Sequence, residues 1–526
     1  MKKKVFCTLL LLVSLVTFSQ NFEITKGKIF KDKKKNSSLL FALNDENGGL
    51  ITIRSFYSGF LIKTLKGYYI QHFDADLNLK KEHVLNVKEN RIENAFIKND
   101  KLHLIEFNKS KKNKSLVYTI LTTSLNAFDF TSKKLLSISE KNSKKYFEIM
   151  IFPFFINNGL NQLDSDHMGS VSMSENNKFF AINFDIKNKE KETHKVFVYN
   201  DRFELVFEKL IVKKIKDRFF DYNTIEVDDN DGTVYFLGKS FENESRKKKK
   251  KGKTNYHFEL SKIDANGEQM VSFKNPNKFI SSLSLIKNKD NLSCIGFYGN
   301  KDEGRLNGVC LINIDTKTFE VETKKFNPFS DTFLTDKYGN KERKKKRKAK
   351  KGLRNMEFRS IEIQENGDLI ISAEEDYITV HTSMGQNGSM STHTIQHYDD
   401  IIALRLSNKG NLLWSRNINK AQTGYANSSF TTISLNNKTH YFMNCSDNIR
   451  KLSDDRIQFR QTSSKKSNLY VITLNDEGIF DYKKLIDDKV SKVFYKVNQG
   501  VIAPSKDEVI LLGKKKKNSR IIKIKI

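Results

Sequence analysis

The chain has 526 residues, with 92 Lys or Arg against 62 Asp or Glu, so its formal net charge is +30 at pH 7. Only four prolines are present and no Pro-rich or Gly/Ser-rich stretch occurs, which argues against a string of domains joined by disordered linkers. Its 40 Phe and 18 Tyr can fill the cores between packed sheets. A single domain built from repeats can therefore account for a length that ordinarily indicates several domains.

The N-terminal residues are typical of a secretory signal peptide. Lysines occupy positions 2–4, an apolar run covers 5–16, and a processing site follows at 17–20. The apolar run is too short to span a membrane, and no later segment is long enough. We therefore expect a signal peptide at 1–20, export to the periplasm or the cell exterior, and no transmembrane segment.

Four short strands recur in a fixed order along the rest of the chain. Each copy has an alternating strand, a tight Asn/Asp/Gly turn, a second strand, a variable loop, a third strand, a short turn and a fourth strand with an aromatic residue. The clearest copy covers residues 358–416. Other copies lie at 50–87, 92–138, 196–207, 258–273, 309–321 and 430–482.

The two ends of the chain complement each other. The C-terminus supplies three strands, at 500–505, 509–513 and 519–526, and residues 22–30 supply a spare one. Pairing them removes an exposed edge. The prediction is an all-β fold, a β-propeller of eight four-stranded blades closed by the N-terminal strand, forming one domain over 21–526. Seven blades, or a pair of β-sandwiches, are the alternatives.

The segment at 400–416 resembles the quinoprotein-like propeller repeat, in which a tryptophan strand docks between blades. Trp414 matches that position, and Phe203, Phe273, Phe319 and Tyr482 stand at comparable places. The resemblance is to uncharacterised, non-enzymatic exported bacterial members with a Tyr-x-Asp-Ile-Ile strand, here starting at Tyr398. The cofactor-binding enzymes of that fold carry adjacent cysteines, which this chain lacks, so no cofactor is expected.

Three cysteines follow the N-terminal segment, at Cys294, Cys310 and Cys445. An odd number cannot form a complete disulfide framework. Cys294 and Cys310 lie on successive strands of one expected hairpin and could form a disulfide. The alternative, which we favour, is that all three are small buried hydrophobic residues.

The long insertions all fall on the connections between strands two and three and between blades, so one face of the propeller is elaborated. Insertions at 242–254 and 330–353 carry dense basic runs. Loops on a rigid scaffold are frequent binding sites, and a polyanion is the ligand that such runs attract. The residues expected to bind it are Arg246, Lys247, Lys248, Lys249, Arg343, Lys344, Lys345 and Arg347.

These observations predict an exported, monomeric binding scaffold without assigned catalysis. Its partner would be an acidic glycan, lipopolysaccharide or an envelope protein. Sequence-specific nucleic-acid binding is not expected, because no helix-turn-helix, zinc-finger or RNP signature occurs. The basic runs could equally be solvated loop filler.

An extracellular polysaccharide-active enzyme is the alternative function. Carboxylates at the propeller mouth could supply an acid and a base, and clustering of Asp164, Asp166, Glu374 and Asp399 would favour this reading. Glu375, Asp376 and Asp400 lie beside them in sequence. No nucleophile or metal-helix motif occurs, so no catalytic residue is assigned. His381, His393 and His397 share one hairpin, and His381 and His397 could face each other across its strands, but their spacing matches no ligand pattern, so no metal site is assigned.

Overall fold

The computed structural model describes most of the chain after its first 21 residues. The predicted signal peptide lies outside the described residues and stays a prediction. The described residues are 22–32, 36–45, 47–59, 64–87, 90–143, 170–247, 249–250, 253–275, 277–288, 291–300, 305–348, 353, 355–384, 390–424, 428–461, 467–503, 505 and 507–526.

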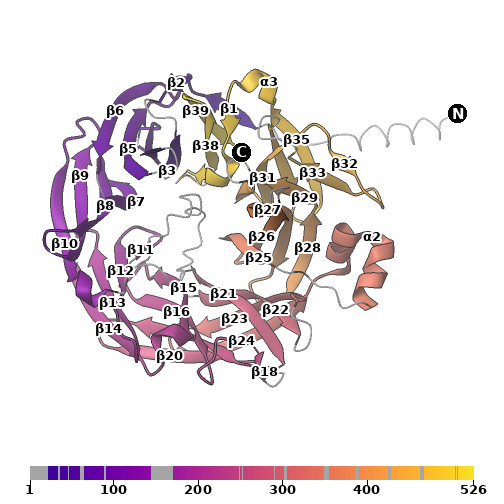
Figure 1. Cartoon of the computed structure of the whole chain (residues 1–526), viewed down its shortest axis with the longest axis horizontal. Helices are drawn as coiled ribbons and strands as arrows, with labels where there is room; N and C mark the ends of the chain where they lie inside the picture. The colour runs from indigo at the N-terminus through magenta and orange to yellow at the C-terminus, as the bar shows by residue number, and fades with distance from the viewer. Residues whose placement is uncertain are drawn as a thin grey trace, which may run out of the picture.

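The described strands form eight antiparallel blades arranged in a ring, as Figure 1 shows. This confirms the predicted eight-bladed propeller. The first four blades consist, in order, of β3 (Asn36–Asn44), β4 (Leu50–Ser58), β5 (Thr64–Phe73) and β6 (Leu79–Asn86); β7 (Arg91–Lys98), β8 (Lys101–Ser110), β9 (Ser115–Ser124) and β10 (Thr131–Ser139); β11 (Ser170–Met173), β12 (Phe179–Asp185), β13 (Glu192–Asn200) and β14 (Leu205–Lys213); and β15 (Phe220–Val227), β16 (Val234–Phe241), β19 (Tyr256–Ile263) and β20 (Glu268–Phe273).

The last four blades follow the same order, and the eighth takes its outermost strand from the N-terminus. They consist of β21 (Lys278–Asn288), β22 (Asn291–Asn300), β23 (Gly308–Asp315) and β24 (Val321–Pro328); β25 (Met356–Ile363), β26 (Leu369–Met384), β27 (Met390–Leu406) and β28 (Leu412–Ile418); β30 (Phe430–Leu435), β31 (Lys438–Cys445), β34 (Asn468–Leu474) and β35 (Phe480–Ile486); and β36 (Phe494–Tyr495), β37 (Val501–Ile502), β38 (Glu508–Lys515), β39 (Asn518–Lys525) and β1 (Glu23–Lys26).

The remaining strands and α-helices lie in connections between strands two and three or between blades, as expected for one elaborated face. Helix α2 is interrupted at Gly339, where φ is +74°, and Figure 1 shows it outside β28. No described helix is long and apolar enough to cross a membrane. These elements are β17 (Lys249–Lys250), β18 (Lys253–Thr254), α2 (Asp331–Lys348), β29 (Lys420–Thr423), β32 (Arg450–Lys451), β33 (Ile457–Arg460) and α3 (Asp488–Ser491), with a short β2 (Phe30–Lys31) beside β39.

The hydrophobic core is divided among the blade interfaces. Each cluster of buried apolar residues joins two successive blades; Phe236 and Val198, for example, belong to one cluster from blades four and three. The second strands are buried on both faces, as in β16, whereas the fourth strands, such as β20, are half exposed. Every blade therefore depends on both neighbours for its apolar burial.

The turn between strands three and four repeatedly carries a residue in the left-handed region that inserts toward the preceding blade. Phe203 (φ +62°) packs on His103 of blade two with ring centroids 5.1 Å apart, and Phe319 (φ +56°) packs on Tyr235 of blade four. In blade seven the position is Gly478 (φ +75°), and Trp414 of blade six packs against it. Trp414 Nε1 also donates to the Asp476 carbonyl (2.8 Å), so the tryptophan docks between blades as expected.

Gly478→Ala should lower the free energy of unfolding by about 1–3 kcal/mol, because φ is positive and an added Cβ would lie 2.9 Å from the Trp414 ring. Urea unfolding followed by the fluorescence of the single tryptophan measures it. Gly424→Ala is the matched control, since its φ is also positive (+103°) and nothing lies within 4 Å of its Cβ position. Equal effects of the two substitutions would contradict the docking role.

The ring closes through β1, which pairs antiparallel with β39 from Glu23 opposite Lys525 to Lys26 opposite Ile522. This is the predicted union of the chain ends, and Figure 1 shows the two strands side by side. Asp32, just after β2, then joins blade eight to blade one.

Asp32 is the charged centre of that joint. Its carboxylate accepts from both Nη atoms of Arg54 in blade one (3.0 and 2.9 Å). It also accepts from Lys514 Nζ and Ser519 Oγ of blade eight, each at 2.7 Å. Arg54 has no exposed side-chain surface. The two blades are thus held by a buried ion cluster.

Asp32→Asn should lower the free energy of unfolding at pH 7 by about 3–5 kcal/mol, because it leaves two buried cations without their counter-charge. Burial alone would raise the pKa of Asp32, but Arg54 and Lys514 outweigh burial and hold it well below its usual range. A lowered folded-state pKa contributes stability above the unfolded-state value of about 3.9, and this contribution is lost as the pH falls below it.

Urea midpoints measured from pH 7 down to pH 3 test this prediction, and the variant should lose less stability with acid than the wild type. The control is Asp201→Asn, which removes a half-exposed partner of Lys98 and should cost less than about 1 kcal/mol. A variant as stable as that control would contradict the role of Asp32.

The strand register and the cysteine positions test two further predictions. Cys294, Cys310 and Cys445 are free and buried, as we favoured, and Cys294 stands opposite Ile312 rather than Cys310. The expectation that His381 faces His397 is wrong: His381 pairs with His393, and His397 pairs with Tyr377.

Candidate functional site

Charged side chains gather where β26 and β27 leave the sixth blade. Both strands continue beyond their neighbours as a two-stranded ribbon, in which residues 376–384 pair with 390–398. The register shifts between Glu374 and Asp376, where Asp399 and Asp400 of β27 lie opposite the single residue Glu375, so the bulge is in β27. Bulges redirect side chains at the edges of sheets.

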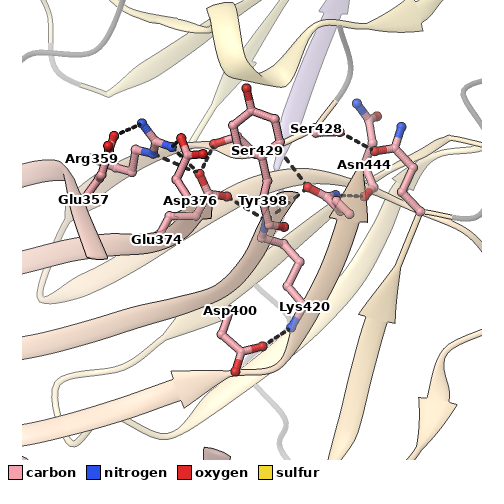
Figure 2. Close-up of polar contacts among 12 residues, drawn as sticks. Glu357, Arg359, Glu374, Asp376, Tyr398, Asp400, Lys420, Ser428, Ser429 and Asn444 are labelled. Atoms are coloured by element: carbon pink, nitrogen blue, oxygen red, sulfur yellow. Dashed lines mark hydrogen bonds and ion pairs between the residues drawn. The ribbon is translucent and has the colours of Figure 1, made fainter. Parts of the chain in front are cut away.

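Arg359 of β25 holds two carboxylates together, as Figure 2 shows. Its Nε and Nη2 donate to Glu374 Oε2 (2.9 and 2.8 Å), and Nη2 also donates to Asp376 Oδ2 (2.7 Å). Nη1 lies 3.5 Å from Glu357 Oε2. Arg359 is itself the bulged residue of β25, between Phe358 and Ser360, which aims it at the end of β26.

Glu374 is held from the opposite side by Lys420 of β29. Lys420 Nζ donates to Glu374 Oε1 (2.6 Å), to the Tyr398 carbonyl (2.6 Å) and to Gln422 Oε1 (3.1 Å). Ser429 Oγ donates to Glu374 Oε2 (2.7 Å). Burial would raise the pKa of Glu374, but the Lys420 and Arg359 cations outweigh it and lower the pKa, so this carboxylate stays ionised.

Asp376 has the opposite protonation tendency. Burial raises its pKa, and the Arg359 guanidinium only partly offsets that effect. Gln396 Nε2 donates to the other oxygen, Asp376 Oδ1. Two carboxylates on one guanidinium therefore have pKa values displaced in opposite directions, which is the arrangement of many acid and base pairs.

Further charged residues surround Arg359, Glu374 and Asp376 and hold them in place. Lys337 of α2 donates to Glu375 Oε2 and Asp400 Oδ2, each at 2.8 Å. The backbone N–H of Lys420 donates to Asp400 Oδ1 (3.0 Å), and Tyr377 O–H donates to Asp399 Oδ2 (2.7 Å). Helix α2 and β29 are thereby tied to the base of the ribbon, and the elaborated face is rich in carboxylates here.

Of the acidic residues expected at the mouth, Glu374 lies at the centre of this group and Asp399 at its edge. Asp164 and Asp166 lie outside the described residues. Sequence patterns missed Arg359 and Lys420 because one depends on a bulge and the other on a connection between blades. The run Glu374-Glu375-Asp376 directly after an apolar strand was the available signal.

The basic residues expected to bind a polyanion are described only in part. Arg246 is engaged within the protein: Nη2 donates to Asp221 Oδ1 (2.6 Å) and Nη1 to the Arg218 carbonyl (2.7 Å). The backbone N–H of Lys247 donates to Ser245 Oγ. Polyanion binding by these residues stays a prediction. Lys248 lies outside the described residues, as do the side chains of Lys249, Arg343, Lys344, Lys345 and Arg347.

The described carboxylates around Arg359 and Lys420 in blade six do not include three ligand groups close enough to share one metal ion. Among the described residues, the one set of three ligand groups close enough to share a metal ion is Asp185, Glu192 and His194 in blade three.

No protein-family model matches the chain, and no curated protein matches it. Solved structures that match include the Pyrococcus horikoshii acylaminoacyl peptidase, with 10% identity over 92% of this chain and 58% of that chain and a TM-score of 0.37. Another is prolyl oligopeptidase B from Galerina marginata, with 6% identity over 91% and 55% and a TM-score of 0.38. The Bombyx mori GH32 beta-fructofuranosidase BmSUC1 matches with 8% identity over 95% and 93% and a TM-score of 0.26.

These matches correct the predicted function. The prediction of a catalysis-free binding scaffold is wrong, because the matched structures are peptidases and a glycosidase, which are enzymes. The chain spans little more than half the length of the two peptidases. At identities of 6–10% no substrate or catalytic residue is transferred from them.

Lys420→Met should lower the free energy of unfolding by about 3–5 kcal/mol, because it leaves the buried Glu374 carboxylate without one of its two cations. Urea unfolding at pH 7 measures the change. The control is Lys484→Met, whose half-exposed ammonium pairs with Asp447 and Asp487 and should contribute less than about 1 kcal/mol. Equal losses for the two variants would contradict a structural role for the buried pair.

Proposed function

We propose that this protein is a hydrolytic enzyme whose acid–base chemistry takes place at the base of the blade-six ribbon. Asp376 is the proton donor, Arg359 binds an oxygen atom of the substrate, and Glu374 positions Arg359. The observation that carries the proposal is the shared guanidinium, which brings a protonatable and an ionised carboxylate together.

The distances support this assignment. Because Arg359 Nη2 lies 2.8 Å from Glu374 Oε2 and 2.7 Å from Asp376 Oδ2, the two oxygens are at most about 5.5 Å apart. A carboxyl group with a raised pKa serves as a general acid, whereas its ionised neighbour stabilises positive charge nearby. In the reaction, Asp376 gives its proton to the leaving group while water adds to the other side of the broken bond, and the proton that this water releases returns Asp376 to its acid form.

Exposure distinguishes Arg359 from Glu374, and the Asp376 side chain is 5% exposed. The Glu374 side chain is fully buried, so it acts through Arg359 rather than on the substrate. Arg359 is 17% exposed, and Glu357 next to its Nη1 is 51% exposed. A substrate approaching from the Glu357 side would meet Nη1 of Arg359 first, with Asp376 on the adjacent Nη2.

We also infer that the repeat is of the quinoprotein-like type and that the protein is exported. The docking of Trp414 on the next blade supports the first inference. The basic and apolar N-terminal segment supports the second. Fractionation of the cells that produce the protein tests export.

Asp376→Asn should lower kcat/KM at least about 100-fold, because the amide cannot donate a proton in the acid's place. The purified protein is first assayed on chromogenic glycosides, esters and peptide anilides to find the hydrolysed bond. Activity of the wild type should fall as the pH rises through the raised pKa of Asp376, and this limb should vanish in the variant.

The matched control is Glu357→Gln, which alters a carboxylate on the same guanidinium without removing the proton donor, and it should change kcat/KM less than about tenfold. Thermal unfolding verifies that each variant is folded. An Asp376→Asn protein that is folded and as active as the wild type would exclude the proposal, as would a wild type inactive on every bond class.

A further inference from the structure

A cavity of about 530 Å³ lies between blades two and three, on the face of the ring that carries the tight turns. Its walls come from the β7–β8 turn, β8 and β9 in blade two and from the β13–β14 turn in blade three. Volumes of about 300–1,000 Å³ are typical of sites for small molecules. Figure 1 shows these two blades across the ring from the ribbon of β26 and β27, so the cavity is separate from the site proposed for hydrolysis.

The β7–β8 turn places two lysines side by side at this cavity. Asn99 and Asp100 form the turn, both with positive φ, and Lys98 stands directly opposite Lys101 in the register. Side chains in such positions point to the same face of the sheet, where like charges repel. Asp201 of blade three pairs with Lys98. The Lys101 ammonium has no ion pair or hydrogen bond in the part of the chain that the structure describes.

Blade three brings a further cation to the cavity. Arg202 is exposed in the β13–β14 turn, and its guanidinium has no partner among the described residues. Burial lowers the pKa of His103 to about 4, and the charges of Lys101 and Lys98 act in the same direction, so this ring is neutral at pH 7. Because Asp201 compensates Lys98, the positive charges of Lys101 and Arg202 remain uncompensated.

An aromatic wall adjoins these cations. His103 follows Lys101 by two residues on β8, so both side chains point to the same face. The His103 ring stacks on Phe96, and Phe203 packs on it from blade three, with ring centroids 5.1 Å apart in both pairs. Thr122 Oγ1 lies 3.0 Å from His103 Nδ1 and fixes the ring. Phe203 lines the cavity and is partly exposed, so its ring can contact a ligand.

The corresponding joint between blades four and five is surrounded by carboxylates instead. There Phe319 packs on Tyr235, as Phe203 does on His103. Burial raises the pKa of Tyr235, and three nearby carboxylates add to this effect; they belong to Asp228, Asp231 and Asp264. Packing of the turn against the preceding blade therefore does not require cations, and those between blades two and three are available for a ligand.

We propose that this cavity binds a sugar unit that carries a sulfate or phosphate group. Lys101 and Arg202 hold the oxyanion, because charge-assisted hydrogen bonds to such groups are strong and a guanidinium can donate two of them. The apolar face of the sugar packs on Phe203, and its hydroxyl groups meet Asn99 and Thr122. Sulfate and phosphate present the same tetrahedral oxyanion, so the experiment separates them. The site does not depend on the hydrolysis proposed for blade six.

Isothermal titration calorimetry on the full chain compares glucose 6-sulfate, glucose 6-phosphate and glucose at physiological ionic strength. One site per chain is expected for at least one of the two anions, with glucose binding at least about tenfold more weakly. The anion that binds more tightly identifies the group that the cavity recognises. Saturable binding of neither anion, or binding of glucose as tight as theirs, would overturn the proposal.

Substitution of the exposed cations should change affinity and leave the fold intact, which thermal unfolding verifies. The double variant Lys101→Met, Arg202→Gln should weaken binding of the anion at least about 100-fold. Asp201→Asn should tighten it at least about threefold, because a carboxylate that lines the cavity is removed. The matched control is Lys317→Met, which removes an exposed lysine two residues before Phe319 in the corresponding turn of blade five. Equal affinities of the double variant and this control would contradict the proposed site.

Discussion

The propeller depends on one carboxylate, Asp32. Each blade buries its apolar side chains against two neighbours, so the ring has no stable open form in which one interface is missing. The N-terminal segment closes the ring by pairing with β39 through four residues of β1 and two of β2, which is a short ladder for joining two blades. Asp32 strengthens it by bringing Arg54 of one blade and Lys514 of the other to a single buried anion.

The blade interfaces are completed by a second recurring device, the left-handed residue of the turn between strands three and four. A phenylalanine with positive φ costs about 1–2 kcal/mol of backbone strain, but burying its ring against the preceding blade contributes about 2–3 kcal/mol. Phe128 and Phe319 follow this solution. Blade seven uses the opposite arrangement. Gly478 adopts the positive φ without strain, and Trp414 of the preceding blade fills the space beside it. In these three joints one large side chain fills the space between the blades.

The sequence predicted the number of blades and their closure because both follow from strand periodicity and from complementary chain ends. It predicted the candidate site less well. Glu374 was recognisable as a charge after an apolar strand, but the aim of Arg359 depends on a bulge that leaves no sequence signature. Lys420 looks like any surface lysine, yet the folding of β29 over the blade buries it completely. His381 was placed opposite His397, whereas the ribbon register pairs it with His393, four residues away, because the polar sequence does not show where the ribbon turns.

Net charge says little about the interior of the propeller. A chain with a formal charge of +30 suggests a function carried by its lysines, which stays a prediction, whereas the buried charges described above are organised around carboxylates. Arginine and lysine neutralise Asp32 and Glu374, and in blade three two further carboxylates converge on a histidine. A buried anion must be matched within a few ångströms, whereas an exposed cation is neutralised by water and salt. Charge that determines structure or chemistry is therefore found by burial and contact, and the overall excess of lysine does not locate it.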